Sequence, residues 1–270
     1  ATGVITKAEV ISPFTLSYNG AGITVSNAVW EEMKKTVPME NGKPVHPVSA
    51  SALKPVLESY KKAGKNFNLG MTFPVGTHNY HERYWLAAGG IHPGFYAPEK
   101  GDNSGSIGAE ALLSVVPPPQ MVPTMEAGTT VGYCVGEPWN QQAVTKGLGV
   151  PVITSENIWV DGADKVFGVT KSFYDKYPNT TVRTVKALIR ASAWLDANEN
   201  ANRPEAVKII SRPVYVGADE QVIANSMTGT FEFEKGDKRP VPDFNKFFRG
   251  QYGIPYYSDV IWWMTQMRRW

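Results

Sequence analysis

The stretch Phe67-Asn-Leu-Gly-Met-Thr-Phe-Pro-Val-Gly-Thr-His-Asn-Tyr-His-Glu-Arg-Tyr-Trp-Leu-Ala-Ala-Gly-Gly90 decides the fold. Residues 67–73 are a short apolar run and predict a buried strand. The turn 74–78 follows, and residues 79–88 predict a helix that Gly89-Gly90 ends. A strand, a glycine turn and a helix are half of a βαβ unit, so we expect a parallel sheet covered by helices.

The same order of elements recurs on both sides of this stretch. Apolar runs predict strands at residues 111–116, 130–135 and 150–154. Spacing and punctuation by Pro and Gly predict helices at residues 49–64, at 117–127, and from 136–139 to 147. Such alternation is typical of an α/β fold. Loops at the carboxyl ends of parallel strands carry ligand sites in these folds, and three loops qualify: residues 74–78, 117–120 and 136–139.

The C-terminal half is richer in helical patterns. A long helix is expected after Pro178, with one apolar face made of Val182, Val185, Leu188, Ile189, Ser192 and Leu195. Residues 204–211 predict a shorter helix. The tail, residues 258–270, is amphipathic and carries Trp262, Trp263 and Trp270. We expect a helix docked on the body, and a helix that binds a partner or a membrane surface is the alternative.

Composition excludes several classes of protein. The chain has 270 residues, 42% of them apolar and 19% charged, which suits two compact lobes. The net charge of +2 comes from scattered Lys and Arg, so no nucleic-acid partner is expected. The single cysteine, Cys134, lies in an apolar stretch and is expected to be a packing residue. No signal peptide is visible at Ala1, which leaves mature, trimmed and cytoplasmic forms open. No catalytic motif is present, so we expect no enzyme.

Four segments resemble the nitrate- and bicarbonate-binding proteins of bacterial ABC importers: Met71–His78, Arg83–Gly90, Val116–Met121 and Gly132–Asn140. Leu16–Asn27 and Ile261–Trp270 also look like that family, and Ser172–Ile210 is similar to the wider group of sulfonate and taurine binders. The chain departs from the family in two ways. The family's opening strand and helices are missing before Ala1, and Ala21 follows Gly20 where a glutamine is often found.

This resemblance implies a two-lobed α/β fold of the type II periplasmic-binding-protein kind, without its N-terminal strand and helices. Residues 1–66 would form part of lobe I and the crossover, 67–135 the α/β lobe II, and 136–270 the return to lobe I with the helical tail. The implied function is a periplasmic receptor, either free or anchored to the inner membrane, that captures nitrate or nitrite for the membrane subunits of an ABC importer. Two alternatives stay open: a bicarbonate receptor and a cytoplasmic nitrate sensor that controls a regulatory partner.

Nitrate accepts hydrogen bonds and donates none, so its site needs convergent donors. Thr77 and His78 meet that need in a glycine-softened turn before a helix. Gln120, which follows three prolines, is a further candidate donor. The resemblance implies Lys165 as the counter-charge. It also points to the Asn19-Gly20 loop and to Gly136.

Glu137 and Trp139 complete the candidate site. Glu137 is expected to bridge the lobes, orient His78 or cap a helix, and Trp139 to pack under the ligand or in the core. His81 and Glu82, one turn past His78, are expected to face solvent or cap their helix. The spacing of His78 and His81 is too weak a signal for zinc, so no metal or cofactor is expected. Calcium, with Glu137 as an oxygen ligand, is the exception if the ligand is bicarbonate.

Overall fold

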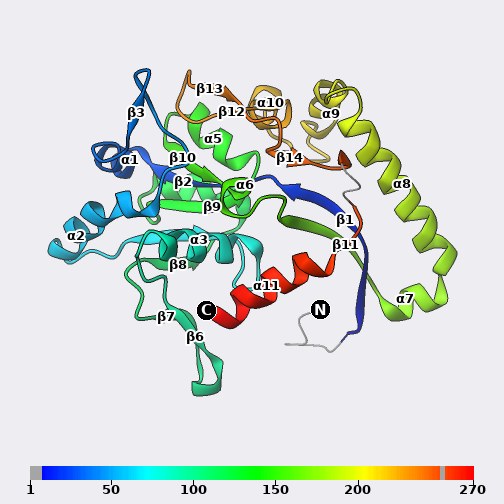
Figure 1. The fold of residues 1–270 in the computed structure, drawn as a ribbon, viewed down its shortest axis with the longest axis horizontal. Coiled ribbons are helices and arrows are strands. Elements are labelled where there is room, and N and C mark those ends of the chain that lie inside the picture. Colours follow the sequence, from blue (N-terminus) through cyan, green and yellow to red (C-terminus); the bar gives the residue numbers. More distant parts are fainter. Residues whose placement is uncertain (1–7, 250–252) are drawn as a thin grey trace.

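A five-stranded sheet lies at the centre of the molecule (Figure 1). The computed structural model describes residues 8–249 and 253–270. The strands of the sheet run in the order β10 (Gly149–Thr154), β2 (Ala21–Ser26), β9 (Gly132–Gly136), β5 (Asn68–Met71) and β8 (Leu112–Val115). The decisive stretch forms β5 and helix α3 (Thr77–Ala88), as its pattern predicts. Strands β5 and β9 pair directly, which confirms that residues 67–73 and 130–135 belong to one sheet.

The expectation of an all-parallel sheet was wrong at one strand. Strand β5 is parallel to both β8 and β9, but β2 runs antiparallel to both of its neighbours, β9 and β10. The reason is that β2 does not come from a βαβ unit. It follows directly on strand β1 (Val10–Asn19) and enters the sheet from the opposite end.

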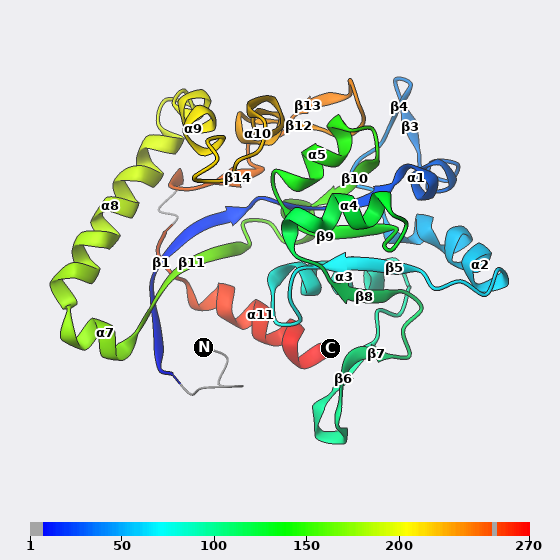
Figure 2. The same ribbon diagram turned by 180° about the vertical axis from the view of Figure 1, so that it is seen from behind.

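Helices cover both faces of the sheet, so successive residues of its central strand, β9, pack alternately into two cores. Cys134 of β9 packs in the larger core with Trp30, Leu53, Trp85 and other side chains of α1 (Asn27–Met33), α2 (Lys54–Lys62) and α3. Its neighbours Tyr133 and Val135 pack on the other face with α4 (Met121–Glu126) and α5 (Trp139–Thr145), which Figure 2 shows in front of the sheet. The packing role expected for Cys134 is confirmed, and burial raises the pKa of its thiol well above the usual value.

A second sheet leads away from the first. In it, β1 lies between β11 (Ala163–Thr170) and β14 (Asn245–Lys246), antiparallel to both. The chain turns from β1 into β2 at Asn19 and Gly20, whose φ angles are 61° and 84°. Beyond β11 lie the helices of the C-terminal half: α7 (Lys171–Lys176), α8 (Pro178–Asp196), α9 (Arg203–Ile210) and α10 (Glu220–Met227).

The long helix α8 and the tail helix α11 (Tyr257–Arg269) both form as predicted. The tail is docked, because Trp262 is buried and its ring lies 6.0 Å from that of Tyr84 on α3. The apolar face predicted for α8 is buried only in part: Ser192 is buried, whereas Val182 and Ile189 are exposed.

Smaller elements complete the chain. Two helices predicted as single pieces each begin with a 3₁₀ turn, at η1 (Ala50–Leu53) before α2 and at η3 (Pro118–Gln120) before α4. Their prolines sit in first turns, where the missing N–H costs nothing. The remaining short elements are β3 (Met39–Glu40), β4 (Lys43–Pro44), β6 (Phe95–Ala97), η2 (Pro98–Lys100), β7 (Asp102–Ile107), α6 (Ser155–Ile158), β12 (Thr230–Glu232) and β13 (Lys238–Pro240).

The central sheet takes strands from all three ranges into which the sequence analysis divides the chain, 1–66, 67–135 and 136–270. The division into lobes at those boundaries stays a prediction. In the described part of the chain, no helix combines the length and the apolar character that a membrane crossing requires.

Candidate functional site

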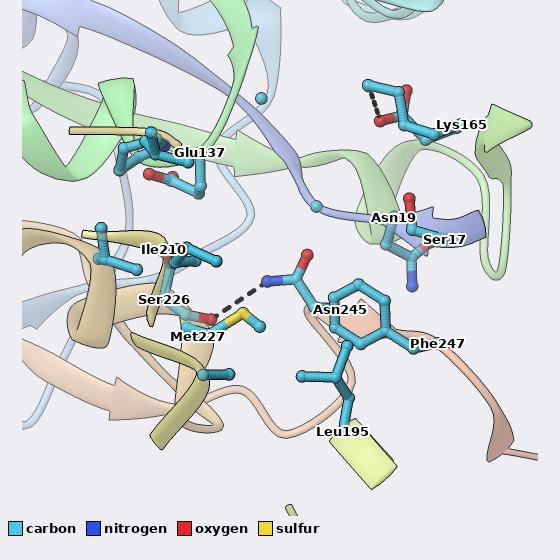
Figure 3. A pocket seen from close by; sticks show the side chains of 17 residues that line it. Ser17, Asn19, Glu137, Lys165, Leu195, Ile210, Ser226, Met227, Asn245 and Phe247 are labelled. Carbon is cyan, nitrogen blue, oxygen red and sulfur yellow. Dashed lines mark hydrogen bonds and ion pairs between the residues drawn. The ribbon is translucent and has the colours of Figure 1, made fainter. Parts of the chain in front are cut away.

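A cavity of about 350 Å³ opens where the two sheets meet the helices α8, α9 and α10 (Figure 3). One side of it is polar and the other apolar. The polar side chains on its wall are Ser17, Asn19, Glu137, Asp164, Lys165, Ser226 and Asn245. The apolar ones include Leu195, Ile210, Met227 and Phe247. Figure 3 shows Ser17 and Asn19 together on one wall, with Glu137 across from them.

The reversed direction of β2 creates the polar side. Because β2 is antiparallel to β9, its first residue, Ala21, pairs with Gly136, the last residue of β9. The loop Asn19-Gly20 therefore lies beside the loop that begins at Glu137, and the Glu137 N–H donates to the Gly20 carbonyl at 3.2 Å. Gly20 must stay small, since a Cβ there would stand 2.4 Å from Asn245 Oδ1 and its φ is positive.

Glu137 caps helix α5 and also faces the cavity. Its Oε2 accepts a hydrogen bond from the Gln141 N–H at 3.1 Å, which is the capping role expected for it. Its Oε1 is buried and has no hydrogen-bond partner among the described residues. Burial raises the pKa of the carboxyl to about 8, against the opposing effect of the Gln141 and Asn140 hydrogen bonds. At neutral pH the group is therefore mostly uncharged and can donate a proton to a ligand oxygen.

Lys165 brings a positive charge to the cavity wall from strand β11. Its side chain is half exposed, and its ammonium forms an ion pair with the carboxylate of the adjacent Asp164. The other oxygen of Asp164 accepts a hydrogen bond from Thr77 Oγ1 at 2.7 Å. Thr77 thus ties the start of α3 to β11 from behind the wall, and it does not itself line the cavity.

His78 lies inside the first turn of α3 rather than in a loop before it, because the helix begins at Thr77 after its N-cap, Gly76. The imidazole is buried, and its Nδ1 forms a 2.8 Å hydrogen bond with Thr72 Oγ1. Its Nε2 has no partner among the described residues and lies 3.8 Å from the place where a Cβ on Gly136 would stand. Burial lowers the pKa of His78 to about 4, so the ring is neutral at pH 7.

The expectation that His81 and Glu82 face solvent was wrong. Both are buried, because α3 is covered by the sheet on one side and by α11 on the other. The His81 ring lies 5.2 Å from that of Trp263, and burial lowers its pKa to about 3. Burial raises the pKa of Glu82 well above its usual value. The position of His81 within its own helix carries no information about α11, which covers it from the other side.

Four of the sequence-predicted site residues, Thr77, His78, Gln120 and Trp139, are not among those that line the cavity. Gln120 is exposed at the end of a 3₁₀ turn, and Trp139, the first residue of α5, packs against the core that α5 forms with α4. Five others, Asn19, Gly20, Gly136, Glu137 and Lys165, line the cavity together. Sequence reasoning missed Asp164 and Asn245. Asp164 could have been found as the neighbour of a candidate lysine, whereas Asn245 had no local signal.

The two asparagines complete the polar wall. Asn19 pairs with Asn245 across β1 and β14, and its Nδ2 donates to the Asp243 carbonyl at 3.0 Å. Its Oδ1 is buried without a partner among the described residues. Asn245 Nδ2 donates to the Ser226 carbonyl at 3.3 Å. Within residues 8–249 and 253–270, no group of three His, Cys, Asp or Glu side chains is placed to hold a metal ion.

The chain is similar to several curated proteins and solved structures, and two relatives and one structure show the likeness. The nitrate/nitrite binding protein NrtA of Nostoc sp. is 33% identical over 226 residues, which are 83% of this chain and 47% of that protein. The bicarbonate transport ATP-binding protein CmpC of Synechococcus elongatus is 31% identical over 97% of this chain and 34% of its own length. The chain spans half or less of the length of these two relatives.

The crystal structure of the periplasmic nitrate-binding protein NrtA from Synechocystis has the same fold. It matches 99% of this chain and 62% of its own with a TM-score of 0.82 and 27% sequence identity. The chain therefore has the α/β fold of periplasmic solute-binding proteins, as the resemblance implies. The sequence profile of one family also matches residues 1–211. On that match, the chain belongs to the NMT1-like family.

Proposed function

We propose that this protein is the receptor that captures nitrate or nitrite for an ABC importer, and that it does so in the periplasm. The observation that carries the proposal is the placement of Lys165 on the wall of the cavity. Apart from Asp164, the other polar groups there are uncharged: two amides, two hydroxyls and the protonated Glu137. An ammonium gives a small anion its counter-charge, and uncharged donors add hydrogen bonds. The 33% identity to a nitrate/nitrite binding protein supports the same ligand.

This role is that of a binding protein rather than an enzyme. The matched fold is one of periplasmic solute-binding proteins, and its NrtA member is named for nitrate binding. The importer's membrane subunits would be the partners of the loaded receptor. No reaction is needed, because the receptor has only to hold the anion and release it.

Bicarbonate is the second candidate ligand, and one observation favours it. Unlike nitrate, bicarbonate carries an O–H that needs an acceptor. Asn19 Oδ1 is a buried amide oxygen on the cavity wall without a partner among the described residues, so it offers an acceptor for that O–H. The 31% identity to a bicarbonate transport protein points the same way.

Isothermal titration calorimetry on the full-length protein separates these candidates. Nitrate, nitrite, bicarbonate with calcium, and taurine should each be titrated at pH 7 in a buffer without other oxyanions. We expect the tightest binding for nitrate or nitrite. Tighter binding of bicarbonate would select the second candidate, and heat with taurine alone would refute both.

A further inference from the structure

Asp164 occupies an unusual position for a carboxylate in a cavity proposed to bind an anion. It precedes Lys165 on β11, lies on the same wall, and its side chain is only 6% exposed. Both of its oxygens are engaged, Oδ1 by Thr77 Oγ1 at 2.7 Å and Oδ2 by the Lys165 ammonium. The carboxylate is therefore part of the wall and cannot swing into solvent.

The two partners of this ion pair differ in freedom. The side chain of Lys165 is 55% exposed, whereas Asp164 is held by α3 through Thr77. An ammonium that is paired with a fixed carboxylate offers an arriving anion little net charge. To bind the anion strongly, Lys165 must share or leave its bond to Asp164, and it is the lysine that can move.

We propose that Asp164 is an internal counter-ion that competes with the bound anion for Lys165 and so holds the affinity below the value that the lysine alone would give. This inference rests on the proposed function of the cavity. Asp164 acts through Lys165, so it is a positioning residue. Thr77 does not line the cavity, but its hydrogen bond holds the Asp164 carboxylate in place on the wall.

Asp164→Asn tests the proposal, because it removes the charge and keeps an oxygen that can accept from Thr77. We expect the dissociation constant for nitrate to fall about tenfold, since an adjacent fixed charge in a partly solvated site has an effect of this order. The same substitution in a Lys165→Met background should give no gain. Asp164→Ser, which is smaller, provides a second way to remove the charge if the Asn variant does not fold, as judged by circular dichroism.

Each outcome decides the question. A tenfold gain that needs Lys165 supports the competition, as does an anion bound by Asp164→Asn but neither by the wild type nor by Asp164→Asn in the Lys165→Met background. An equal gain with and without Lys165 shows that Asp164 repels the ligand directly, and it overturns the proposal. Unchanged or weaker binding by Asp164→Asn also overturns it, while wild-type binding leaves the receptor function standing. If neither protein binds any of the anions tested, the receptor function and this inference fall together.

Discussion

His78, a ligand contact predicted from the sequence, is not among the residues that line the cavity, and its contacts are those of a structural residue. Its ring is buried between the sheet and the start of α3, and it bonds to Thr72. His78→Ala leaves a cavity and an unpaired hydroxyl, so we expect the free energy of unfolding to fall by about 2–4 kcal/mol. Urea unfolding followed by circular dichroism measures it. The exposed Gln120→Ala variant is the control and should unfold with the wild type. A His78→Ala protein of unchanged stability would contradict the packing described above.

Glu137 predicts a pH dependence of stability. The pKa of its carboxyl is about 8 in the folded protein and near 4.5 in the unfolded chain. Between these values the folded state binds one more proton, so stability is lost as pH rises from about 4.5 to about 8. Glu137→Gln cannot ionise. Its stability relative to the wild type should therefore increase with pH in that window, by at most about 1.4 kcal/mol per pH unit.

Denaturant titrations of both proteins at several pH values between 5 and 8 check this slope. A constant offset between them is expected in addition, because the amide replaces the carboxyl oxygen that caps α5. If the difference in stability between the two proteins did not change with pH, Glu137 would ionise as it does in water. The neutral donor assigned to the cavity wall would then be charged at pH 7.

The tail helix α11 packs on the body through only one of its faces. Trp262 is buried against α3, while Ile261 and Met264 on the other side are 63% and 61% exposed. Trp262→Ala should therefore destabilise the protein by about 3 kcal/mol, within the range for deleting a buried aromatic side chain. Met264→Ala is the matched control and should change stability by less than about 0.5 kcal/mol. Differential scanning calorimetry distinguishes them, and equal losses would mean that α11 is docked differently.

Local patterns predicted most of the elements and few of the contacts between them. The strand and helix of residues 67–88 could be read because apolar periodicity and glycine punctuation are properties of neighbours in the chain. The direction of β2 could not be predicted in this way, because it depends on pairing with β9, more than a hundred residues away. The burial of His81 depends in the same way on α11.

The candidate site was predicted unevenly for the same reason. Lys165 and the Asn19-Gly20 loop came from the family resemblance, and the structure brings them to one cavity with Gly136 and Glu137. Gln120 follows a parallel strand, which is why it was a candidate, but it is exposed and is not among the residues that line the cavity. Asn245 sits in a two-residue strand whose sequence carries no signal, and only its pairing with Asn19 places it at the wall.

The whole receptor is expected to bind nitrate without a divalent cation. The positive charge of its cavity comes from Lys165, and a protein ammonium is unaffected by chelators. Nitrate titrations in the presence and absence of EDTA should therefore give the same dissociation constant, within a factor of about two. Loss of all anion binding under chelation would favour bicarbonate held with calcium. Taurine serves as the negative control in both buffers.

The cavity wall is closed by segments from opposite ends of the described chain: Asn19 bonds to the backbone of Asp243, 224 positions further along. Closing such a loop costs entropy that only the finished fold repays, so this wall forms late in folding. A growing chain that has not yet delivered β14 has no complete pocket. An anion bound to the finished wall cannot hasten the early steps, and it acts mainly by slowing the opening of the native state.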